Sequence, residues 1–538
     1  MSISVLDTEN LPTDIELLHS IIRNQSKENE AILKKSSEKY TALLLEIEEL
    51  KARLNRQLNH RFGQRTEKQN QLMMFDDCPL FAGKADEIVD GDDEKDIEES
   101  TKPEKRKPKR VPINQNAELT ETKETIQPPE EDLICDNCSG ELKEFGQEKT
   151  TQYKYIPASI QAHTIVRAKF GCKKCDNGSV KIAELPSQPI PKSNADASLL
   201  SDILVSKFND HLPLYRIANI YQRHGVTISR STLSDWVMKC GILLAPIAEF
   251  MMKQILKSHH IFTDDTKVPL QNGKGALKKA ILWVYLGDEG HPYCVFKHSP
   301  TRQGRYPQEI LKEYTGYIHA DAYTGYDAIF KPKIANHPHA YECSCWVHTR
   351  RYFANIIKTG PPLKEAKYAV KEIAKLYKIE SESKDFSNED RRLYRLEHSK
   401  PIIDEFGHWL DAHKDFNQHS DFKKAVTYAR NQWNALQTFL EDGRLSMDNN
   451  KSEQAIRPIA VGRKNWLFAG SDGAAKNAAV IQSLVATCKI HEVNPYAYFN
   501  DALLIMAEAR DTGNTEKAAG FTPLAWKQFK ENAEKIES

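Results

Sequence analysis

The segment 258–351 restricts the fold of this chain most, because short strand-forming runs alternate there with acidic residues. A helix is expected over 305–314, and a strand over 317–321 ends on Asp321. Three strands in a meander, then a helix, then a strand ending in an acid, is the order of a ribonuclease-H-like mixed α/β core. The three strands of the meander are expected at 260–270, 279–286 and 293–297.

Two aspartates of this segment are candidates for one metal site. In a ribonuclease-H-like core the first and fourth strands lie side by side, so Asp264 and Asp321 are expected to approach each other. Two carboxylates in one cleft repel each other unless a cation lies between them, and hard oxygen ligands select Mg²⁺ or Mn²⁺. Such a site serves phosphodiester chemistry. Asp265 is expected on the other face of its strand and is only a reserve candidate.

A third carboxylate is expected after a helical interruption. The core is predicted to extend over 258–351 and 447–510, with an all-helical insertion over 352–446 whose tryptophans Trp409 and Trp433 belong to its interior. Glu453 then lies early in a helix that Asp448 or Asn450 can cap. The helices of the insertion are expected near 366–377, 392–413 and 422–440.

Four cysteines in two Cys-x-x-Cys pairs mark a separate segment, 131–185. Four thiolates in this arrangement match structural Zn²⁺, and a closed site of four cysteines leaves no open position for catalysis. The gap between the pairs exceeds the usual ~15–20 residues, which implies an inserted strand pair. Paired redox thiols are the competing interpretation. The proposed zinc ligands are Cys135, Cys138, Cys172 and Cys175.

The first 130 residues divide into a helical part and a charged part. Residues 1–70 include a heptad pattern that predicts a modest coiled coil, although a helix packed on its own protein is an alternative. Residues 71–130 carry an acidic block followed by a basic run over 102–110, so a disordered linker is expected. The basic run is equally compatible with DNA phosphates and with a solvated linker.

Residues 194–257 resemble a helical DNA-binding unit. Pro213 can start one helix, Gly225 breaks it, and Ser229 or Ser231 can cap the next, which is a helix-turn-helix arrangement. An ordinary helical hairpin is the alternative. The side chains of the second helix that would suit DNA are Arg230, Thr232 and Lys239.

Several ordered motifs give the chain a specific resemblance. They are DDT at 264–266, DAYTGY at 321–326, CWVHTRR at 345–351, DNNKSE at 448–453 and GRKNWLF at 462–468, with RFGQRTEK at 61–68 and HLPLYR at 211–216 before them. In this order they resemble the DDE transposase of the bacterial insertion sequence 66 family over nearly the whole chain. Asp265 stands where glutamate is usual and Thr66 where serine is usual. The C-terminal tail, 511–538, is given no function.

The resemblance implies roles for individual residues. Asp264, Asp321 and Glu453 would be catalytic metal ligands for Mg²⁺ or Mn²⁺, and Cys345 with His348 would be the C-x-x-H signature. His348 is expected to help position a DNA strand rather than to bind metal. The other basic side chains expected to contact DNA phosphates, with ordinary surface charge as the alternative, are Arg350, Arg351, Arg457, Arg463 and Lys464.

The implied function is cleavage of DNA at the ends of a mobile element and strand transfer into target DNA. Partners would be double-stranded DNA (terminal inverted repeats and target), further copies of the chain, and accessory proteins of the element, in the bacterial cytoplasm on the nucleoid. Net charge is zero, so DNA-binding charge must be local. No apolar run is long enough to suggest a membrane span, and no phosphate-binding loop suggests ATP use. A non-catalytic DNA-binding regulator and a structure-specific nuclease on the same fold are the rival interpretations.

Overall fold

The computed structural model describes residues 158–171, 180–271, 277–330, 340–359, 363–416 and 419–537. The coiled coil, the charged linker and the four zinc cysteines all lie outside the described residues, so those expectations stay predictions. The chain divides into two compact units. The architecture below concerns the unit that contains residues 164–538.

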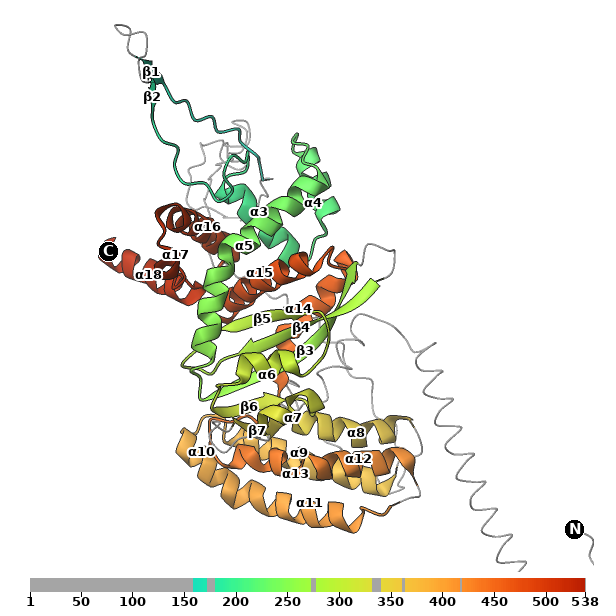
Figure 1. Ribbon diagram of the computed structural model, residues 1–538. Helices are drawn as coiled ribbons and strands as arrows, with labels where there is room; N and C mark the ends of the chain where they lie inside the picture. The colour runs from blue at the N-terminus through green and yellow to red at the C-terminus, as the bar shows by residue number, and fades with distance from the viewer. Residues whose placement is uncertain are drawn as a thin grey trace, which may run out of the picture. The chain divides into compact units, whose positions relative to one another are not determined.

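A five-stranded mixed sheet forms the centre of this unit (Figure 1). Its order is β5-β4-β3-β6-β7, with β3, β4 and β5 antiparallel and with β6 parallel to both β3 and β7. The expectation that the first and fourth core strands are neighbours is therefore confirmed, and the sheet is consistent with a ribonuclease-H-like fold. The bounds are β3 His260–Gln271, β4 Leu277–Leu286, β5 Cys294–Ser299, β6 Gly316–Ala320 and β7 Ala340–Ser344.

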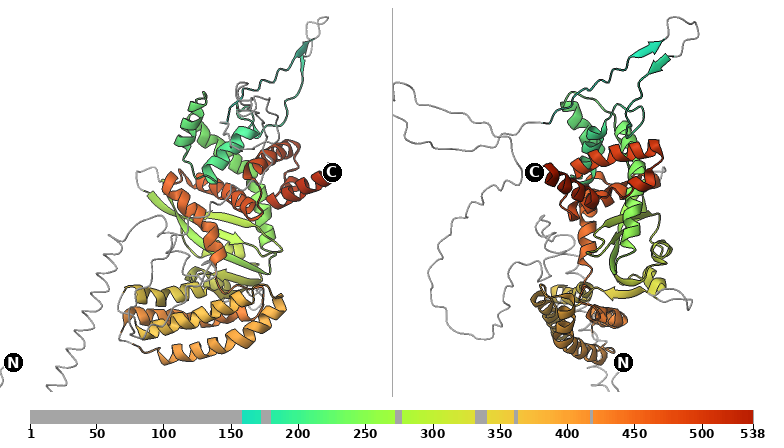
Figure 2. Two further views of the ribbon diagram at one scale, coloured as in Figure 1. Left: turned by 180° about the vertical axis from the view of Figure 1, so that it is seen from behind. Right: turned by 90° about the vertical axis from the view of Figure 1, so that its left-hand side faces the viewer.

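Helices α14 (Asn450–Trp466) and α15 (Asp472–Ile490) cover one face of the sheet (Figure 2). Phe262 and Val284 pack there in one hydrophobic cluster with Ile459 of α14. On the other face Trp283 packs edge-on against Tyr326. Because both faces are covered, β4 is buried along most of its length. The elements between β5 and β7 are α6 Arg305–Leu311, η2 Thr324–Tyr326 and α7 Asp327–Phe330.

Among the described residues, three helices precede the sheet: α3 (Ala197–Phe208), α4 (Leu214–Arg223) and α5 (Arg230–Ile255). Pro213 is the N-cap of α4, and Ser229 caps α5 by accepting a hydrogen bond from the Thr232 N–H. The helix pair predicted around Gly225 is thus present. Helix α5 runs through to Ile255 with Pro246 inside it, and it packs closely on α15. A Cβ at Gly241 would meet the Asn477 side chain at 2.5 Å.

The predicted helical insertion is present and lies beside β6 and β7 (Figure 1). Its interior is a single cluster that contains Trp346, Phe406 and Phe422, against which Trp409 and Trp433 pack as expected. The helix expected over 392–413 begins earlier and contains a π-helical turn. The bounds are α8 Trp346–Thr359, α9 Lys364–Glu382, α10 Asn388–Tyr394, η3 Arg395–Ser399, α11 Lys400–Ala412, α12 Ser420–Asn431, α13 Trp433–Gln437 and η4 Thr438–Leu440.

The C-terminal residues are folded rather than extended. Helices α16 (Pro495–Thr512), α17 (Thr515–Ala518) and α18 (Pro523–Glu537) follow α15, and the Trp526 indole donates to Asp501 at 2.8 Å. A short antiparallel pair, β1 (Lys169–Gly171) and β2 (Val180–Ile182), lies on either side of the second Cys-x-x-Cys pair.

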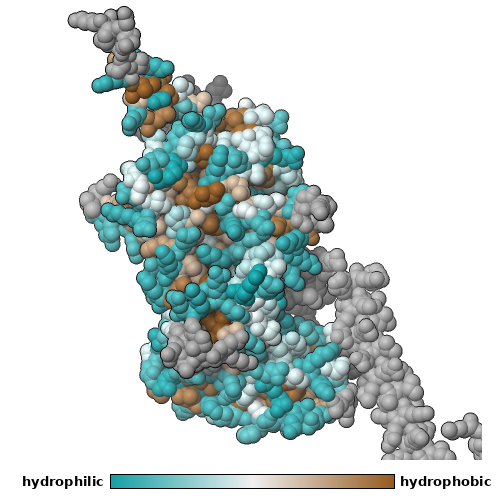
Figure 3. Space-filling model, in the orientation of Figure 1, coloured by the Kyte–Doolittle hydropathy of each residue, from teal (hydrophilic) through white to brown (hydrophobic). Residues whose placement is uncertain are grey.

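The surface of the described part is polar overall. On the face shown in Figure 3, hydrophilic side chains predominate and hydrophobic ones form small separate groups. Among the described helices, none combines the length and the apolar character that crossing a bilayer requires. The large apolar side chains instead fill the clusters of the sheet and of the insertion.

Candidate active site

Three aspartates meet where β3 and β6 separate. The pairing of β3 with β6 covers only His260 to Phe262, and Asp264 lies just beyond it, while Asp321 follows the last residue of β6. Oxygen atoms of Asp264, Asp265 and Asp321 all lie within 4.8 Å of one another. The expected approach of Asp264 and Asp321 is therefore confirmed.

The electrostatics of this group fit a cation. Burial, and then the neighbouring charge of Asp321, raise the pKa of Asp264 to about 8. Burial also raises the pKa of Asp321, although Arg302 opposes this. The Asp321 Oδ1 is buried and has no hydrogen-bond partner in the described part of the chain. Crowded carboxylates with a free buried oxygen match the donors that Mg²⁺ and Mn²⁺ take.

Glu453 approaches the same group from α14. It lies in the first turn of that helix, and its charge contributes to the raised pKa of Asp264. Burial is the main cause that raises the pKa of Glu453 itself, and Arg351 opposes it. Its two oxygens lie 3.6 Å from His348 Nε2 and 3.8 Å from Arg351 Nη2. Glu453 does not belong to the group of three aspartates whose oxygens lie within 4.8 Å of one another.

The start of α14 is fixed to the sheet by Asn449, which the sequence did not single out. The Asn449 side-chain amide donates to the Thr263 carbonyl at 2.9 Å, and its backbone N–H donates to Cys345 Sγ at 3.3 Å. The cap expected at Asp448 or Asn450 is wrong, because Asn449 is the N-cap residue. Asp448 instead accepts from the Asn450 N–H and side-chain amide.

The C-x-x-H residues Cys345 and His348 both contact the segment that carries Glu453. Cys345 is buried, and burial raises the pKa of its thiol, so it stays protonated as an acceptor for Asn449. Burial, and then Arg351, lower the pKa of His348 to about 4, so its imidazole is neutral at pH 7. The arrangement links α8 to the first turn of α14.

Arg302, which the sequence did not mark, joins the acidic group. Its Nε and Nη2 approach Asp265 Oδ1 at 2.7 Å and 2.6 Å, and Nη2 lies 3.4 Å from Asp321 Oδ2. The guanidinium also lies over the Tyr323 ring, 4.0 Å from its centroid. Although alternation puts Asp265 on the other face of β3, the strand edge is open there and its carboxylate still reaches the group.

The predicted DNA-contacting residues fall on three helices. Arg230, Thr232 and Lys239 lie on α5, where Lys239 pairs with Asp235 at 2.7 Å. His348, Arg350 and Arg351 lie on α8, where His348 and Arg351 lie next to Glu453. The remaining three lie along α14, where Arg463 donates to the Lys267 carbonyl of β3: Arg457, Arg463 and Lys464.

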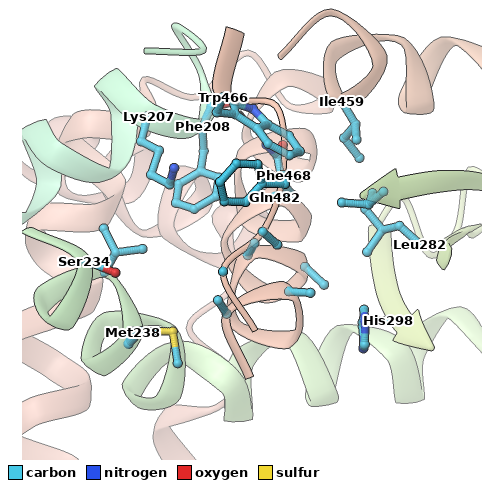
Figure 4. Close-up of a pocket in the computed structure, with 18 of the residues that line it drawn as sticks. Lys207, Phe208, Ser234, Met238, Leu282, His298, Ile459, Trp466, Phe468 and Gln482 are labelled. Atoms are coloured by element: carbon cyan, nitrogen blue, oxygen red, sulfur yellow. Dashed lines mark hydrogen bonds between the residues drawn. The ribbon is translucent and has the colours of Figure 1, made fainter. Parts of the chain in front are cut away.

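A cavity of about 250 Å³ lies elsewhere in the unit, between α5, the sheet and α15 (Figure 4). Its wall is mainly apolar and includes Phe208, Trp466 and Phe468, with Lys207 and His298 as its titratable groups. None of its lining residues in the described part of the chain is a carboxylate. The carboxylate group at the end of β6, and not this cavity, therefore has the chemistry of a divalent-cation site.

Comparison with known proteins assigns the chain to a family. The model described as "Transposase IS66 family" matches residues 192–477, more than half of the chain, and the model described as "zinc-finger binding domain of transposase IS66" matches residues 132–176. Two relatives from Sinorhizobium fredii are named "Uncharacterized protein y4hP" and "Uncharacterized protein y4qI". The first is 30% identical over 422 residues, which is 75% of this chain and 74% of that protein. The second is 28% identical over 532 residues, 94% and 96% of the two chains. The chain belongs to the Transposase IS66 family of DDE transposases, which implies that its function is DNA transposition.

Proposed function

We propose that Asp264, Asp321 and Glu453 hold the divalent metal with which this transposase cuts and joins DNA, Mg²⁺ or Mn²⁺. The observation that carries the proposal is the meeting of Asp264 and Asp321 oxygens, one of them buried and unpartnered, near enough to Glu453 for its charge to raise the pKa of Asp264. A bound cation pair would activate the attacking hydroxyl and stabilise the leaving oxygen. Water would attack at each element end, and the freed 3′-hydroxyl would attack target DNA.

The protein groups around the carboxylates would orient them for this work. Asn449 fixes the start of α14 beside Asp264, and neutral His348 lies against Glu453 without neutralising its charge. The arginines Arg350 and Arg351 on α8 would contact DNA phosphates close to the reacting bond. Recognition of the terminal repeats would fall to α5, where Arg230 and Lys239 are exposed.

The zinc-finger match supports a structural Zn²⁺ on the four cysteines, because residues 132–176 include both pairs. Four thiolates complete a tetrahedral zinc site without an open position. We place this metal in DNA-end binding and not in catalysis. Self-association through residues 1–70 and accessory proteins of the element are further parts of the proposal, and they rest on the sequence alone.

The test replaces each ligand by its uncharged isostere: Asp264→Asn, Asp321→Asn and Glu453→Gln. Losing a residue that only hydrogen-bonds to a metal ligand costs about 10–100-fold, so losing a ligand itself should cost more than ~100-fold in both cleavage and joining. Any two changes together should cost little more than one. The assay follows a labelled element-end duplex through cleavage and strand transfer with Mg²⁺ or Mn²⁺.

The control is Glu389→Gln, which removes an exposed carboxylate of the insertion that pairs with Arg392. It should leave both steps unchanged. Binding of the duplex should survive in all four variants, because the proposed recognition elements are separate. A ligand variant that still joins DNA at the wild-type rate would contradict the assignment. Cleavage without joining in the wild type would favour a nuclease.

A further inference from the structure

We infer that Arg302 is a binding residue for a phosphate of the DNA strand that is cut, and that Asp265 positions it. This inference rests on the proposed function, because it adds a phosphate contact to the same site. It assigns to Asp265 the role of holding a guanidinium, and not the role of a metal ligand. The two roles make opposite predictions for metal binding.

The hydrogen bonds of Asp265 support this assignment. Its side chain is only 4% exposed, and its Oδ1 accepts the Arg302 Nε–H at 2.7 Å and lies 2.6 Å from Arg302 Nη2. Asp321 differs, because its Oδ1 is buried and lacks a partner in the described part of the chain. A cation bound at Asp265 would repel the guanidinium that lies 2.6 Å from its Oδ1, whereas Asp321 meets Arg302 only at 3.4 Å through Oδ2 and keeps Oδ1 without a partner in the described part of the chain.

The guanidinium is held on two sides and open on a third. One edge faces Asp265, and one face lies on the Tyr323 ring. Its Nη1 has no hydrogen-bond acceptor within the described ranges, and the Arg302 side chain is 40% exposed. A planar guanidinium with one edge fixed and one edge exposed is suited to a phosphate.

The loop that carries Arg302 is itself fixed. The Tyr323 hydroxyl donates to the Arg302 carbonyl. A Cβ at Gly304 would lie 2.4 Å from the Gly325 carbonyl oxygen, so only glycine allows this loop to pack so closely on the turn after Asp321. The guanidinium is thus placed beside the carboxylates before DNA arrives, and little conformational entropy remains to be lost when a phosphate binds.

The first measurement is Mn²⁺ binding to the full chain without DNA, in wild type, Asp264→Asn, Asp265→Asn, Arg302→Gln and the double variant Asp265→Asn/Arg302→Gln. The double variant removes one negative and one positive charge, so its local net charge equals that of the wild type. If Asp265 only holds Arg302, the double variant should bind Mn²⁺ as the wild type does, within about twofold. Asp264→Asn should lose this binding.

The second measurement is cleavage of element-end duplexes that carry one neutral methylphosphonate, placed in turn at each position around the cut bond. A charge-assisted hydrogen bond is worth roughly 1.5–3 kcal/mol, which corresponds to about ten- to hundredfold in rate. Arg302→Gln should lose that factor on normal DNA. At one position the methylphosphonate should lower the cleavage rate of the wild type by the same factor. At that position it should not lower the cleavage rate of Arg302→Gln any further.

The two measurements distinguish a metal ligand from a residue that holds Arg302. Loss of Mn²⁺ binding in the double variant, to the level of Asp264→Asn, would make Asp265 a ligand and overturn the inference. Losses from Arg302→Gln and methylphosphonate that multiply at every position would overturn the phosphate contact. Arg302→Lys should cleave faster than Arg302→Gln but more slowly than the wild type, because an ammonium cannot contact Asp265 and a phosphate through two edges of one planar group. If Asp264→Asn binds Mn²⁺ and cleaves normally, the proposed metal site fails instead.

Discussion

Three carboxyl groups of the site are buried close to one another, and this arrangement lowers the stability of the folded protein. Burial is the first cause that raises the pKa of Asp264, of Asp321 and of Glu453. In the absence of a cation, each of them must either keep a proton or carry a charge where solvation is poor. A site of this kind is under strain without metal, and binding a cation relieves the repulsion.

We therefore expect Asp264→Asn to stabilise the metal-free protein. The folded-state pKa of Asp264, about 8, lies above the ordinary value of 3.8. Its ionisation therefore costs no stability below the ordinary value and costs progressively more as pH rises from about 4 to about 8. In the presence of a chelator, the melting temperature of Asp264→Asn should exceed that of the wild type by a few degrees near pH 8. Near pH 4 the two melting temperatures should be the same.

Mn²⁺ should reverse this order at the upper end of the range, because only the wild type keeps all its ligands. Asp404→Asn, an exposed change on α11, serves as the control and should follow the wild type throughout. A melting-temperature difference that is the same at both ends of the pH range would contradict the interpretation. Thermal melts at fixed ionic strength are sufficient.

The residues that could be predicted are those that the chain marks locally. Asp264 lies within a strand-forming run, Asp321 ends another, and Glu453 lies early in a helix-forming run, so each has a position in the order of elements. Arg302 could not be predicted, because it pairs with Asp265 only after β5 has folded back along β4. Asn449 was not predicted, because its side chain makes no capping hydrogen bond and instead donates to the Thr263 carbonyl.

The helical insertion helps to position the active site, because a buried side chain in it binds the segment that leads into α14. Arg395, in the π-helical turn, is 1% exposed and pairs with Glu380 at 2.7 Å. It also donates to the carbonyls of Phe439, Asp442 and Leu445. These carbonyls lie shortly before Asn449, so one buried side chain fixes the return of the chain to the core. Helical periodicity predicted the helices, but nothing local predicted the π turn.

Arg395→Met should therefore lower both stability and catalysis. Removing one partner of a buried ion pair leaves Glu380 and the carbonyls unpaired, which costs about 3–5 kcal/mol. Cleavage should fall together with stability, because Glu453 is no longer held in place. The matched control is Arg392→Met, which removes a surface pair with Glu389 and should change neither. A stable Arg395→Met protein with normal cleavage would refute this link.

At the scale of the whole molecule, the function requires DNA-end binding and catalysis in one chain. Positive and negative side chains balance at 75 each, so long-range attraction to DNA does not come from net charge. Under the proposed function, binding comes from particular segments, and residues 132–176, which match the zinc-finger model, are one candidate. Composition and motif spacing predict this division of the chain, whereas the contacts inside the core depend on the fold.

Cys135→Ser/Cys172→Ser should separate the two activities. Because each pair loses one thiolate, the variant should lose about one zinc per chain, measured by elemental analysis of the purified protein. Its affinity for the element end should fall, while Mn²⁺ binding at Asp264 and Asp321 should persist. Cys78→Ser, outside both pairs, is the control and should keep its zinc.

Asp264→Asn should show the converse pattern, with zinc and DNA binding intact and cleavage lost. Zinc content that is unchanged in the double cysteine variant would show that these thiolates do not hold the metal. Loss of Mn²⁺ binding along with zinc would show that the two parts fold as one.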